Sequence, residues 1–193
     1  MEFEKPTFNA VMIGNEGLTI LLEILYKIHN QHNHIYYISK NYSFGEYIKN
    51  AFNILNIKIN TLSINEFINM NIKQNNLPAI QPGEKHNLYI FDLIEDDFNK
   101  NEIVIIKNTI FTSRRQYSTI TIHNFYEKIP KIIRLSASHL FITNYLNKKD
   151  INIIFKEHNT PKNNIEKITE LCYKITPFKF VFFDIWNYNS TLC

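Results

Sequence analysis

Few residues of this sequence have the type and the spacing that chemistry requires, and the clearest of them is Asp92. It follows the apolar run Leu88–Phe91, which predicts a carboxylate at the carboxyl end of a buried strand. In nucleotide hydrolases an acid at such a position holds Mg²⁺, and a second acid beside it orients the attacking water. The next residue here is Leu93, so the second acid is absent unless Glu95 substitutes for it. The alternative is a polar residue that merely ends a strand, and such residues are common.

A second candidate lies at Gly14–Gly17, between a predicted strand and a predicted helix. This is the layout of a phosphate-binding loop, which has the pattern Gly, four residues, then Gly-Lys-Ser/Thr. Counted from Gly14, those last three positions hold Thr19, Ile20 and Leu21. No basic residue lies between Lys5 and Lys27, and Glu16 places a repelling charge in the turn. The candidate nucleotide-binding residues are Gly14, Asn15, Glu16, Gly17, Leu18 and Thr19.

Arginine is scarce, because the chain has only Arg114, Arg115 and Arg134 beside abundant lysine. Arginine provides what lysine cannot, a planar fork that pairs with phosphate or carboxylate. The alternative is that all three are ordinary surface salt-bridge partners. Lysines also give the predicted C-terminal helices a basic side, which either follows DNA phosphates or is simply solvated. These lysines are Lys148, Lys149, Lys156, Lys162 and Lys167.

Three histidines lie close together at His29, His32 and His34. They straddle a predicted helix end and a predicted strand start, so a metal site would require them to converge with a fourth ligand. The alternative is that they are polar loop histidines.

For five further residues, a structural role is an alternative to a role in binding or catalysis. Cys172 is expected to be a small core residue of the last helix. His139 and His158 are expected to be partly buried and neutral. Trp186 and Tyr188 follow the last predicted strand, where they either stack against a base or cover the end of the sheet.

Composition limits the class of protein. The chain has 193 residues, of which 45% are hydrophobic, enough for one core and a single domain over 1–193. A net charge of +3 allows a nucleic-acid partner without requiring one. Two cysteines are too few for a disulfide framework and indicate a reducing compartment. We expect no signal peptide, no membrane span and no secretion.

The elements that must position these residues alternate along the chain. Apolar and aromatic runs predict strands over Phe8–Ile13, His34–Ser39, Ile57–Leu62, Leu88–Ile94, Ser118–His123, His139–Thr143 and Phe178–Ile185. Helical spacing predicts helices over Leu18–Ile28, Glu46–Leu55, Ile64–Ile72, Glu102–Phe111, Pro130–Leu135, Leu146–His158 and Pro161–Ile175. Thr160 is predicted to cap the last helix, with Pro161 at its first position. Such alternation predicts an α/β fold, a mostly parallel sheet with helices on both faces.

Seven segments, in this order, resemble those of a known family. They are Phe8–Leu25, His34–Lys40, Leu88–Asp92, Ser113–Gln116, Ser118–Asn124, Ile129–Thr143 and Phe178–Asp184. The chain resembles the poxvirus-type genome-packaging ATPases of large DNA viruses, a branch of the FtsK/HerA P-loop superfamily. The most specific part is Ser113–Thr143, which contains SRRQ and IPKIIRLSASHLFIT. The resemblance implies a three-layer RecA-like P-loop NTPase fold, and a ring that pushes duplex DNA into a capsid with ATP.

The resemblance also implies roles for the candidate residues. Asp92 would be the metal acid of the Walker B strand, Glu95 its possible second acid, and His123 would stand at the position of a sensor glutamine. Arg115 or Arg134 would act as an arginine finger into a neighbouring active subunit. The residues expected near DNA are Arg114, Arg115, Lys148 and Lys149.

Three functions follow from the resemblance and its departures. The preferred one is a packaging-ATPase-like protein that no longer hydrolyses ATP and acts as a structural or regulatory partner of a packaging complex. The second is an active but divergent motor, and the third is a DNA-binding or interaction module without nucleotide. ATP and Mg²⁺ are expected only if the site still functions. Expected partners are double-stranded DNA, packaging or capsid proteins and further subunits, in the host cytoplasm or the virion.

Overall fold

The computed structural model describes residues 7–14, 17–40, 42–72, 85–94, 99–113, 116–143, 146–176 and 179–193. The strands are β1 (Asn9–Ile13), β2 (His32–Ile38), β3 (Ile59–Leu62), β4 (His86–Asp92), β5 (Tyr117–His123), β6 (His139–Ile142), β7 (Val181–Asp184) and β8 (Asn189–Leu192). The α-helices are α1 (Gly17–Ile28), α2 (Tyr42–Ile54), α3 (Ile64–Ile72), α4 (Lys100–Ser113), α5 (Lys131–Ser136), α6 (Lys148–Glu157) and α7 (Lys162–Tyr173). The short 3-10 helices are η1 (His29–Gln31) and η2 (Tyr126–Lys128).

The strands form one eight-stranded sheet in the order β3-β2-β4-β5-β1-β6-β7-β8. The predicted α/β fold with a mostly parallel sheet is confirmed. The chain divides into two compact units, which are described separately. Unit 1 contains residues 1–9 and 22–121, and unit 2 contains residues 10–21 and 122–193. None of the described helices combines the length and the apolar character that a bilayer crossing requires.

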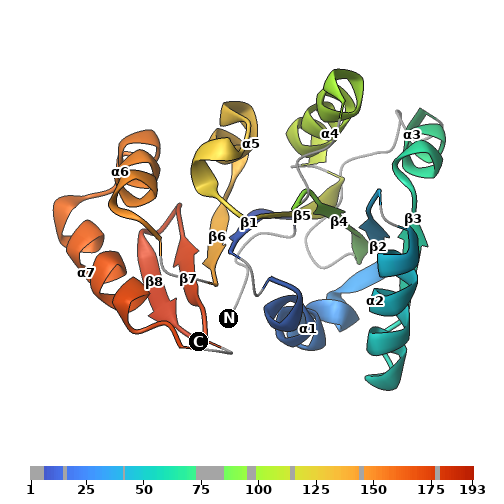
Figure 1. Cartoon of the computed structure of the whole chain (residues 1–193), viewed down its shortest axis with the longest axis horizontal. Helices are drawn as coiled ribbons and strands as arrows, with labels where there is room; N and C mark the ends of the chain where they lie inside the picture. Colours follow the sequence, from blue (N-terminus) through green and yellow to red (C-terminus); the bar gives the residue numbers. More distant parts are fainter. Residues whose placement is uncertain are drawn as a thin grey trace. The chain divides into compact units, whose positions relative to one another are not determined.

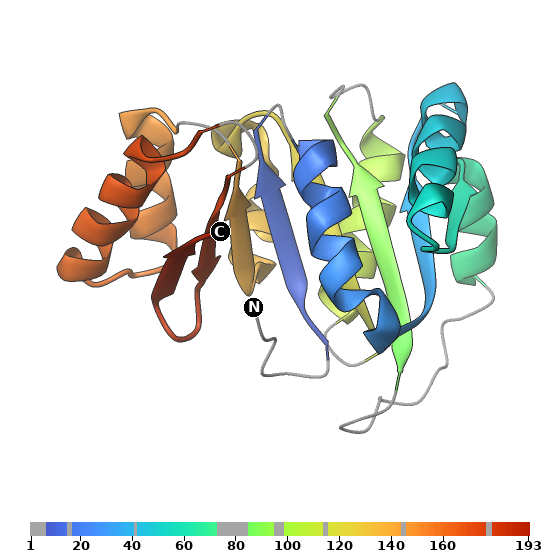
Figure 2. The same cartoon turned by 90° about the horizontal axis from the view of Figure 1, so that it is seen from below.

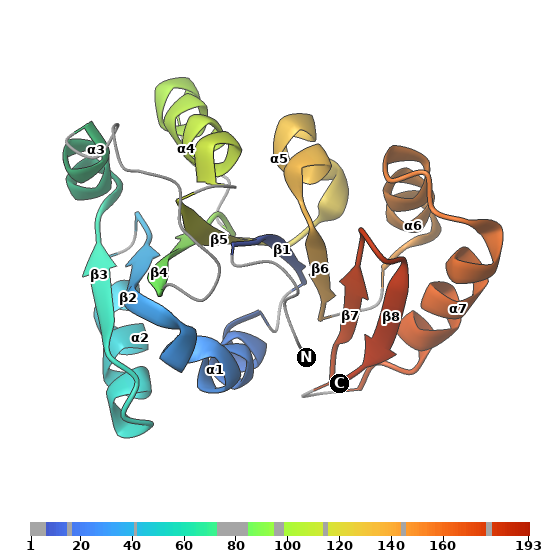
Figure 3. The ribbon, with the colours of Figure 1, turned by 180° about the vertical axis from the view of Figure 1, so that it is seen from behind.

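In unit 1, β2 pairs in parallel with β3 on one side and with β4 on the other. The helix α2 lies on one face of these strands, and α3 and α4 lie on the other (Figures 1 and 3). Aromatic side chains fill the core, with the ring of Phe67 centred 5.6 Å from that of Tyr89 and 5.1 Å from that of Phe91. All three rings are buried, so the strands of this unit are fixed by large, shape-specific contacts.

In unit 2, β1 pairs in parallel with β6, and β7 and β8 continue the sheet in antiparallel pairing. Figure 2 shows the blue β1 beside the brown β6. The helix α7 packs along β7 and β8. Met12, Phe141, Phe180 and Phe183 are fully buried. Met12 pairs with Phe141 across β1 and β6, and the rings of Phe141 and Phe180 are centred 5.9 Å apart.

Side-chain caps explain where three helices begin. Ser63 Oγ accepts the amide of Glu66 at 3.3 Å, and Glu66 accepts the amide of Ser63 at 2.8 Å. Asn99 and Glu102 make the same reciprocal pair before α4, and Asn147 caps α6. Such capping boxes satisfy amides that the helix leaves without partners.

The predicted cap of α7 is wrong. Pro161, not Thr160, occupies the N-cap position, and no side chain caps the helix. The hydroxyl of Thr160 is buried and has no partner within the described part of the chain.

One strand was missed, and two begin two residues earlier than predicted. The sequence predicts Phe178–Ile185 as the last strand, but the chain turns back at Tyr188, where φ is 53°, and forms β8. The strands β2 and β4 begin at His32 and His86, before the apolar runs that predicted them. The first residues of these two strands are polar and His32 pairs with His86, so they show no hydrophobic alternation to detect.

Candidate functional site

The glycine turn begins where β1, β5 and β6 end, at residues that all belong to unit 2. The amide of Gly14 donates to the carbonyl of His123 at 2.8 Å. The carbonyl of Ile13 accepts the amide of Thr143 at 2.9 Å and its hydroxyl at 3.0 Å. Gly14 has φ of 122°, a backbone conformation that L side chains rarely adopt. The start of the turn is therefore fixed by backbone contacts, while Asn15 and Glu16 lie outside the described residues.

The helix that follows begins at Gly17, which gives the turn a different register from the one counted from Gly14. In a phosphate-binding loop the lysine and the hydroxyl follow the glycine that opens the helix. By that criterion Leu18 holds the lysine position, and Thr19 holds the hydroxyl position and is exposed. In this register the hydroxyl position holds Thr19, whereas the count from Gly14 places Leu21 there, so the expected loss of the hydroxyl stays a prediction. The lysine is absent in both registers, and the side chain of Ile20 is buried.

Asp92 lies in unit 1 at the carboxyl end of β4, as predicted. Its carboxylate accepts the hydroxyl of Tyr37 at 2.6 Å on one oxygen and the amide of Ile94 at 3.2 Å on the other. Burial raises the pKa of this carboxyl, although both hydrogen bonds act in the opposite direction. Tyr37 was not singled out from the sequence, because a tyrosine within an apolar strand gives no sign of what its hydroxyl will contact.

These residues are a poor fit for a resident magnesium ion. Mg²⁺ prefers ionised carboxylates and near-ideal octahedral geometry, and Asp92 is a single acid whose burial disfavours its charge. The next residue, Leu93, is buried and apolar. The described residues contain no group of three or more histidine, cysteine or acidic side chains able to hold a metal, and Glu95 lies outside them.

His123 ends β5 in unit 2, and its carbonyl anchors the glycine turn. Its side chain is buried, which lowers the pKa of the imidazole to about 3. The imidazole is therefore neutral at physiological pH. Its Nε2 atom has no hydrogen-bond partner among the described residues. A neutral imidazole at this position offers one donor and one acceptor, but no charge for a phosphate.

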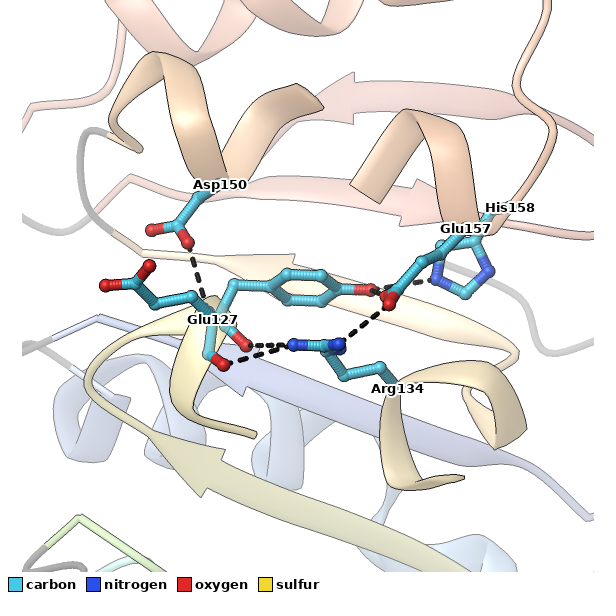
Figure 4. A network of polar contacts seen from close by, with 6 residues as sticks. Glu127, Arg134, Asp150, Glu157 and His158 are labelled. Carbon is cyan, nitrogen blue, oxygen red and sulfur yellow. Dashed lines mark hydrogen bonds and ion pairs between the residues drawn. The ribbon is translucent and has the colours of Figure 1, made fainter. Parts of the chain in front are cut away.

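Arg134 extends from α5 in unit 2 and contacts its own chain (Figure 4). One guanidinium nitrogen pairs with Glu157 of α6 at 2.7 Å, and another donates to the carbonyl of Glu127 at 3.1 Å. The guanidinium also lies over the ring of Tyr126, 5.3 Å from its centre. Its side chain is only 12% exposed. In this conformation Arg134 contributes to the packing of unit 2, and Arg114 and Arg115 lie outside the described residues.

The basic side of the C-terminal helices is partly neutralised. Lys149 is 71% exposed and forms an ion pair with Glu127. That contact raises the pKa of Lys149. Lys156, Lys162 and Lys167 are exposed, as a solvated helix face requires. Nothing is described of the Lys148 side chain, so the predicted DNA contacts of Lys148 and Lys149 stay predictions.

The histidine group does not form a metal site in the described part of the chain. His29 contacts the carbonyl of Tyr26 at 2.9 Å and His34 is exposed. His32 is buried, and its ring lies 4.6 Å from that of His86. Burial, with the neighbouring imidazole of His86, lowers the pKa of His32 to about 3.

The predicted burial of Cys172, His139 and His158 is confirmed. Cys172 is buried, which raises the pKa of its thiol to about 12. His139 is buried against the face of Phe182, and Trp186 covers it with an edge contact at 5.8 Å. His158 is partly buried, which lowers its pKa.

No protein-family model matches the chain, and no curated protein matches it. Solved structures do. The chain is similar to the genome packaging NTPase B204 from Sulfolobus turreted icosahedral virus 2 in complex with AMPPCP, with a TM-score of 0.64, 10% identity and 97% of each chain covered. It is similar to B204, the DNA-packaging ATPase from Sulfolobus Turreted Icosahedral Virus, with a TM-score of 0.62, 14% identity and 96% of each chain covered.

A bacterial protein shares the same architecture. EssC (ATPases 2 and 3) from Geobacillus thermodenitrificans has a TM-score of 0.63 and 8% identity, with 96% of this chain and 38% of that chain covered. At such identities a likeness establishes the fold alone. The chain therefore has the predicted RecA-like P-loop NTPase fold of packaging ATPases.

Proposed function

We propose that this chain is a viral DNA-packaging ATPase-like protein that no longer hydrolyses ATP and acts as a structural or regulatory partner of a packaging complex. The observation that carries the proposal is the first turn of α1, where neither register contains a lysine. Leu18 holds the position set by the helix start, and the buried Ile20 holds the position counted from Gly14. Removing one comparable electrostatic group from an active site costs about 10²–10³ in rate.

The other positions expected to contribute to hydrolysis support the same proposal. Asp92 has a raised pKa and receives hydrogen bonds from its own chain on both oxygens. His123 is neutral, and Arg134 is held by Glu157. Each of these contacts stabilises a folded core, and none of them supplies charge to a triphosphate.

The proposal also includes the branch of packaging ATPases to which the chain belongs. We assign the chain to the poxvirus-type branch of the FtsK/HerA group, on the order of its sequence segments and on its fold. Its partners would then be duplex DNA, packaging or capsid proteins and further subunits, in an infected cell or in the virion. The support is the likeness in fold to B204, a viral genome packaging NTPase.

A divergent active motor is the second candidate, and Thr19 favours it. The exposed hydroxyl of this residue lies in the first turn of α1, where such loops place their magnesium hydroxyl. The B204 structures include complexes with AMP, AMPPCP and ATP-gammaS. In this candidate the backbone amides and the helix N-terminus hold the phosphates without a lysine.

Phosphate release and calorimetry separate the two candidates. With ATP, Mg²⁺ and duplex DNA, we expect no phosphate release above that of a sample without protein, and the same result for Asp92→Asn. Isothermal titration with ATP and Mg²⁺ should give no saturable heat in the wild-type chain. In a Leu18→Lys variant we expect saturable binding, because the variant returns the missing cation to the start of α1.

The opposite result is equally specific. DNA-stimulated phosphate release that Asp92→Asn abolishes, and that the surface variant Glu23→Gln retains, would establish the active motor and overturn the proposal.

A further inference from the structure

A compact polar cluster joins three elements of unit 2, and we call it the latch. It consists of Tyr126 of η2, Arg134 of α5, Glu157 of α6, and His158, which directly follows α6 (Figure 4). Arg134 pairs with one oxygen of Glu157 at 2.7 Å. The hydroxyl of Tyr126 lies 3.3 Å from the other oxygen and 3.0 Å from Nε2 of His158. The latch therefore attaches the end of α6 to the segment between β5 and β6.

The tyrosine hydroxyl has one proton and two neighbours that can accept it. If Tyr126 donates to Glu157, then Nε2 of His158 must carry a proton and donate to the tyrosine oxygen. If Tyr126 donates to His158 instead, the second oxygen of Glu157 loses its donor. The first arrangement gives the Tyr126 hydroxyl and both oxygens of Glu157 a partner, and it fixes His158 as the tautomer with the proton on Nε2. The remaining nitrogen, Nδ1, is then the atom that gains a proton in acid.

Burial makes that proton unfavourable, and it is the largest cause of the lowered pKa of His158. Of the charged neighbours, Glu157 on α6 attracts an imidazolium more strongly than Arg134 on α5 repels it, but Glu157 is already paired with Arg134. The hydroxyl of Tyr188, in the turn between β7 and β8, contacts the carbonyl of His158 at 3.4 Å and supplies no charge to offset the imidazolium. Asp150 of α6 accepts the amide of Glu127, and Lys149 pairs with the Glu127 carboxylate. When His158 is protonated, the carboxylate of Glu157 must therefore balance two positive charges, those of Arg134 and of His158.

We propose that the latch is an acid-opened joint, in which protonation of His158 releases α6 from the segment of η2 and α5. Release lets the imidazolium reach water, which removes the cost of burial, the main obstacle to the proton in the closed latch. Glu157 and Arg134 can then separate as solvated ions, for which the pair contributes little.

The direction of the effect follows from proton linkage. Burial lowers the pKa of His158 in the closed latch, whereas the pKa in an open, solvated state is about 6.5. The open state binds more protons, so the closed latch loses stability as the pH falls below about 6.5. The population of the open state rises by at most about tenfold per pH unit in that range.

Hydrogen exchange measured on the whole chain tests the proposal. Protection factors of amides in α6, corrected for intrinsic exchange, should fall severalfold between pH 7 and pH 5, while those of β6 in the same unit change less. In His158→Gln the α6 protection should lose this pH dependence, because glutamine does not titrate. A matched control, His34→Gln, removes an exposed histidine of unit 1 and should behave as the wild type does.

Two results would overturn the proposal. One is an α6 protection with the same pH dependence in His158→Gln as in the wild type. The other is a parallel loss of protection in α6 and β6, which would show global unfolding. If His158→Gln does not fold, nuclear magnetic resonance titration of the wild-type imidazole decides. A His158 pKa below 6.5, with α6 opening in the same pH range, supports the latch, and a pKa of 6.5 or above excludes it.

Discussion

At the scale of single residues, the carboxylate of Asp92 shows how a position suited to metal chemistry becomes part of a core. The hydroxyl of Tyr37 on the neighbouring strand donates to it at 2.6 Å, and the amide of Ile94 donates to the other oxygen. Burial raises the pKa of Asp92 even so, and it also raises the pKa of Tyr37. The pair is a buried hydrogen bond between two strands, and it contributes to stability in the absence of any ligand.

Replacing Tyr37 with phenylalanine should test this contribution. The change removes the shorter of the two hydrogen bonds to Asp92 and leaves a buried carboxyl with one donor. We expect the free energy of unfolding at pH 7 to fall by about 1.5–3 kcal/mol, the range for hydrogen bonds to charged groups. Urea unfolding followed by circular dichroism measures it. The pKa of Asp92 should rise further, because a hydrogen bond that favours the ionised form is lost.

The neighbouring residue provides the control. Tyr36 lies on the same strand and stacks on Tyr89 at 5.2 Å, a contact that phenylalanine retains. Tyr36→Phe should therefore leave the free energy of unfolding within about 0.5 kcal/mol of the wild type. An equal loss in both variants would mean that the bond to Asp92 makes no specific contribution.

At the scale of elements, two glycines have opposite effects on the structures that contain them. Gly45 lies inside α2, where an added Cβ atom would meet Thr61 at 3.6 Å, an ordinary contact distance. Gly14 directly follows β1 and has φ of 122°. The first glycine weakens its helix through backbone entropy, whereas the second permits the bend that joins β1 to α1.

Alanine at these two positions should therefore change stability in opposite directions. We expect Gly45→Ala to raise the free energy of unfolding by about 0.4–1 kcal/mol, because it reduces the freedom of the unfolded chain without a clash. Gly14→Ala should lower it by about 1–3 kcal/mol through backbone strain. Thermal unfolding of both variants beside the wild type is the measurement. A stabilised Gly14→Ala variant would contradict the bend described for this turn.

At the scale of the whole molecule, each unit contains a histidine that folding keeps neutral. Burial lowers the pKa to about 3 for His32 in unit 1 and for His123 in unit 2. An unfolded histidine has a pKa of about 6.5. The native state thus binds fewer protons than the unfolded state below that pH, so stability falls with acidification from about pH 6.5 towards pH 3.

The expected loss is large beside the stability of an ordinary domain. From pH 6.5 to pH 5, each histidine should lower the free energy of unfolding by less than about 2 kcal/mol, because the slope reaches about 1.36 kcal/mol per pH unit only well below the unfolded pKa. Two of them remove about 3 kcal/mol from a total that is typically about 5–15 kcal/mol. Urea unfolding at both pH values measures the difference. In His123→Gln the pH dependence should shrink by about half, and an unchanged dependence would contradict the neutral state of this residue.

Much of the fold was predictable because it follows from local patterns. The apolar runs and helical spacings identified seven of the eight strands and all seven α-helices. The misses share one cause, since β8 is mostly polar and the starts of β2 and β4 are polar. Their side chains are ordered by pairing with a neighbouring strand, and no periodicity in a single sequence records that pairing.

The sequence predicted where the residues of the candidate site lie, but not which partners their side chains contact. The sequence located Asp92 at a strand end and the missing lysine in the glycine turn. It did not show that Tyr37 donates to Asp92, that α1 begins at Gly17, or that Arg134 pairs with Glu157. The bond between Tyr37 and Asp92 and the ion pair between Arg134 and Glu157 join residues far apart in the chain, and only packing brings them together.

By itself, the sequence determined the alternation of strands and helices and the absence of a lysine at the start of α1, because both are properties of residue order. Only the tertiary structure decided which charges are neutralised and which side chains are neutral. Burial and the distance to a partner determine the charge of a titratable group, and both are set when distant segments pack.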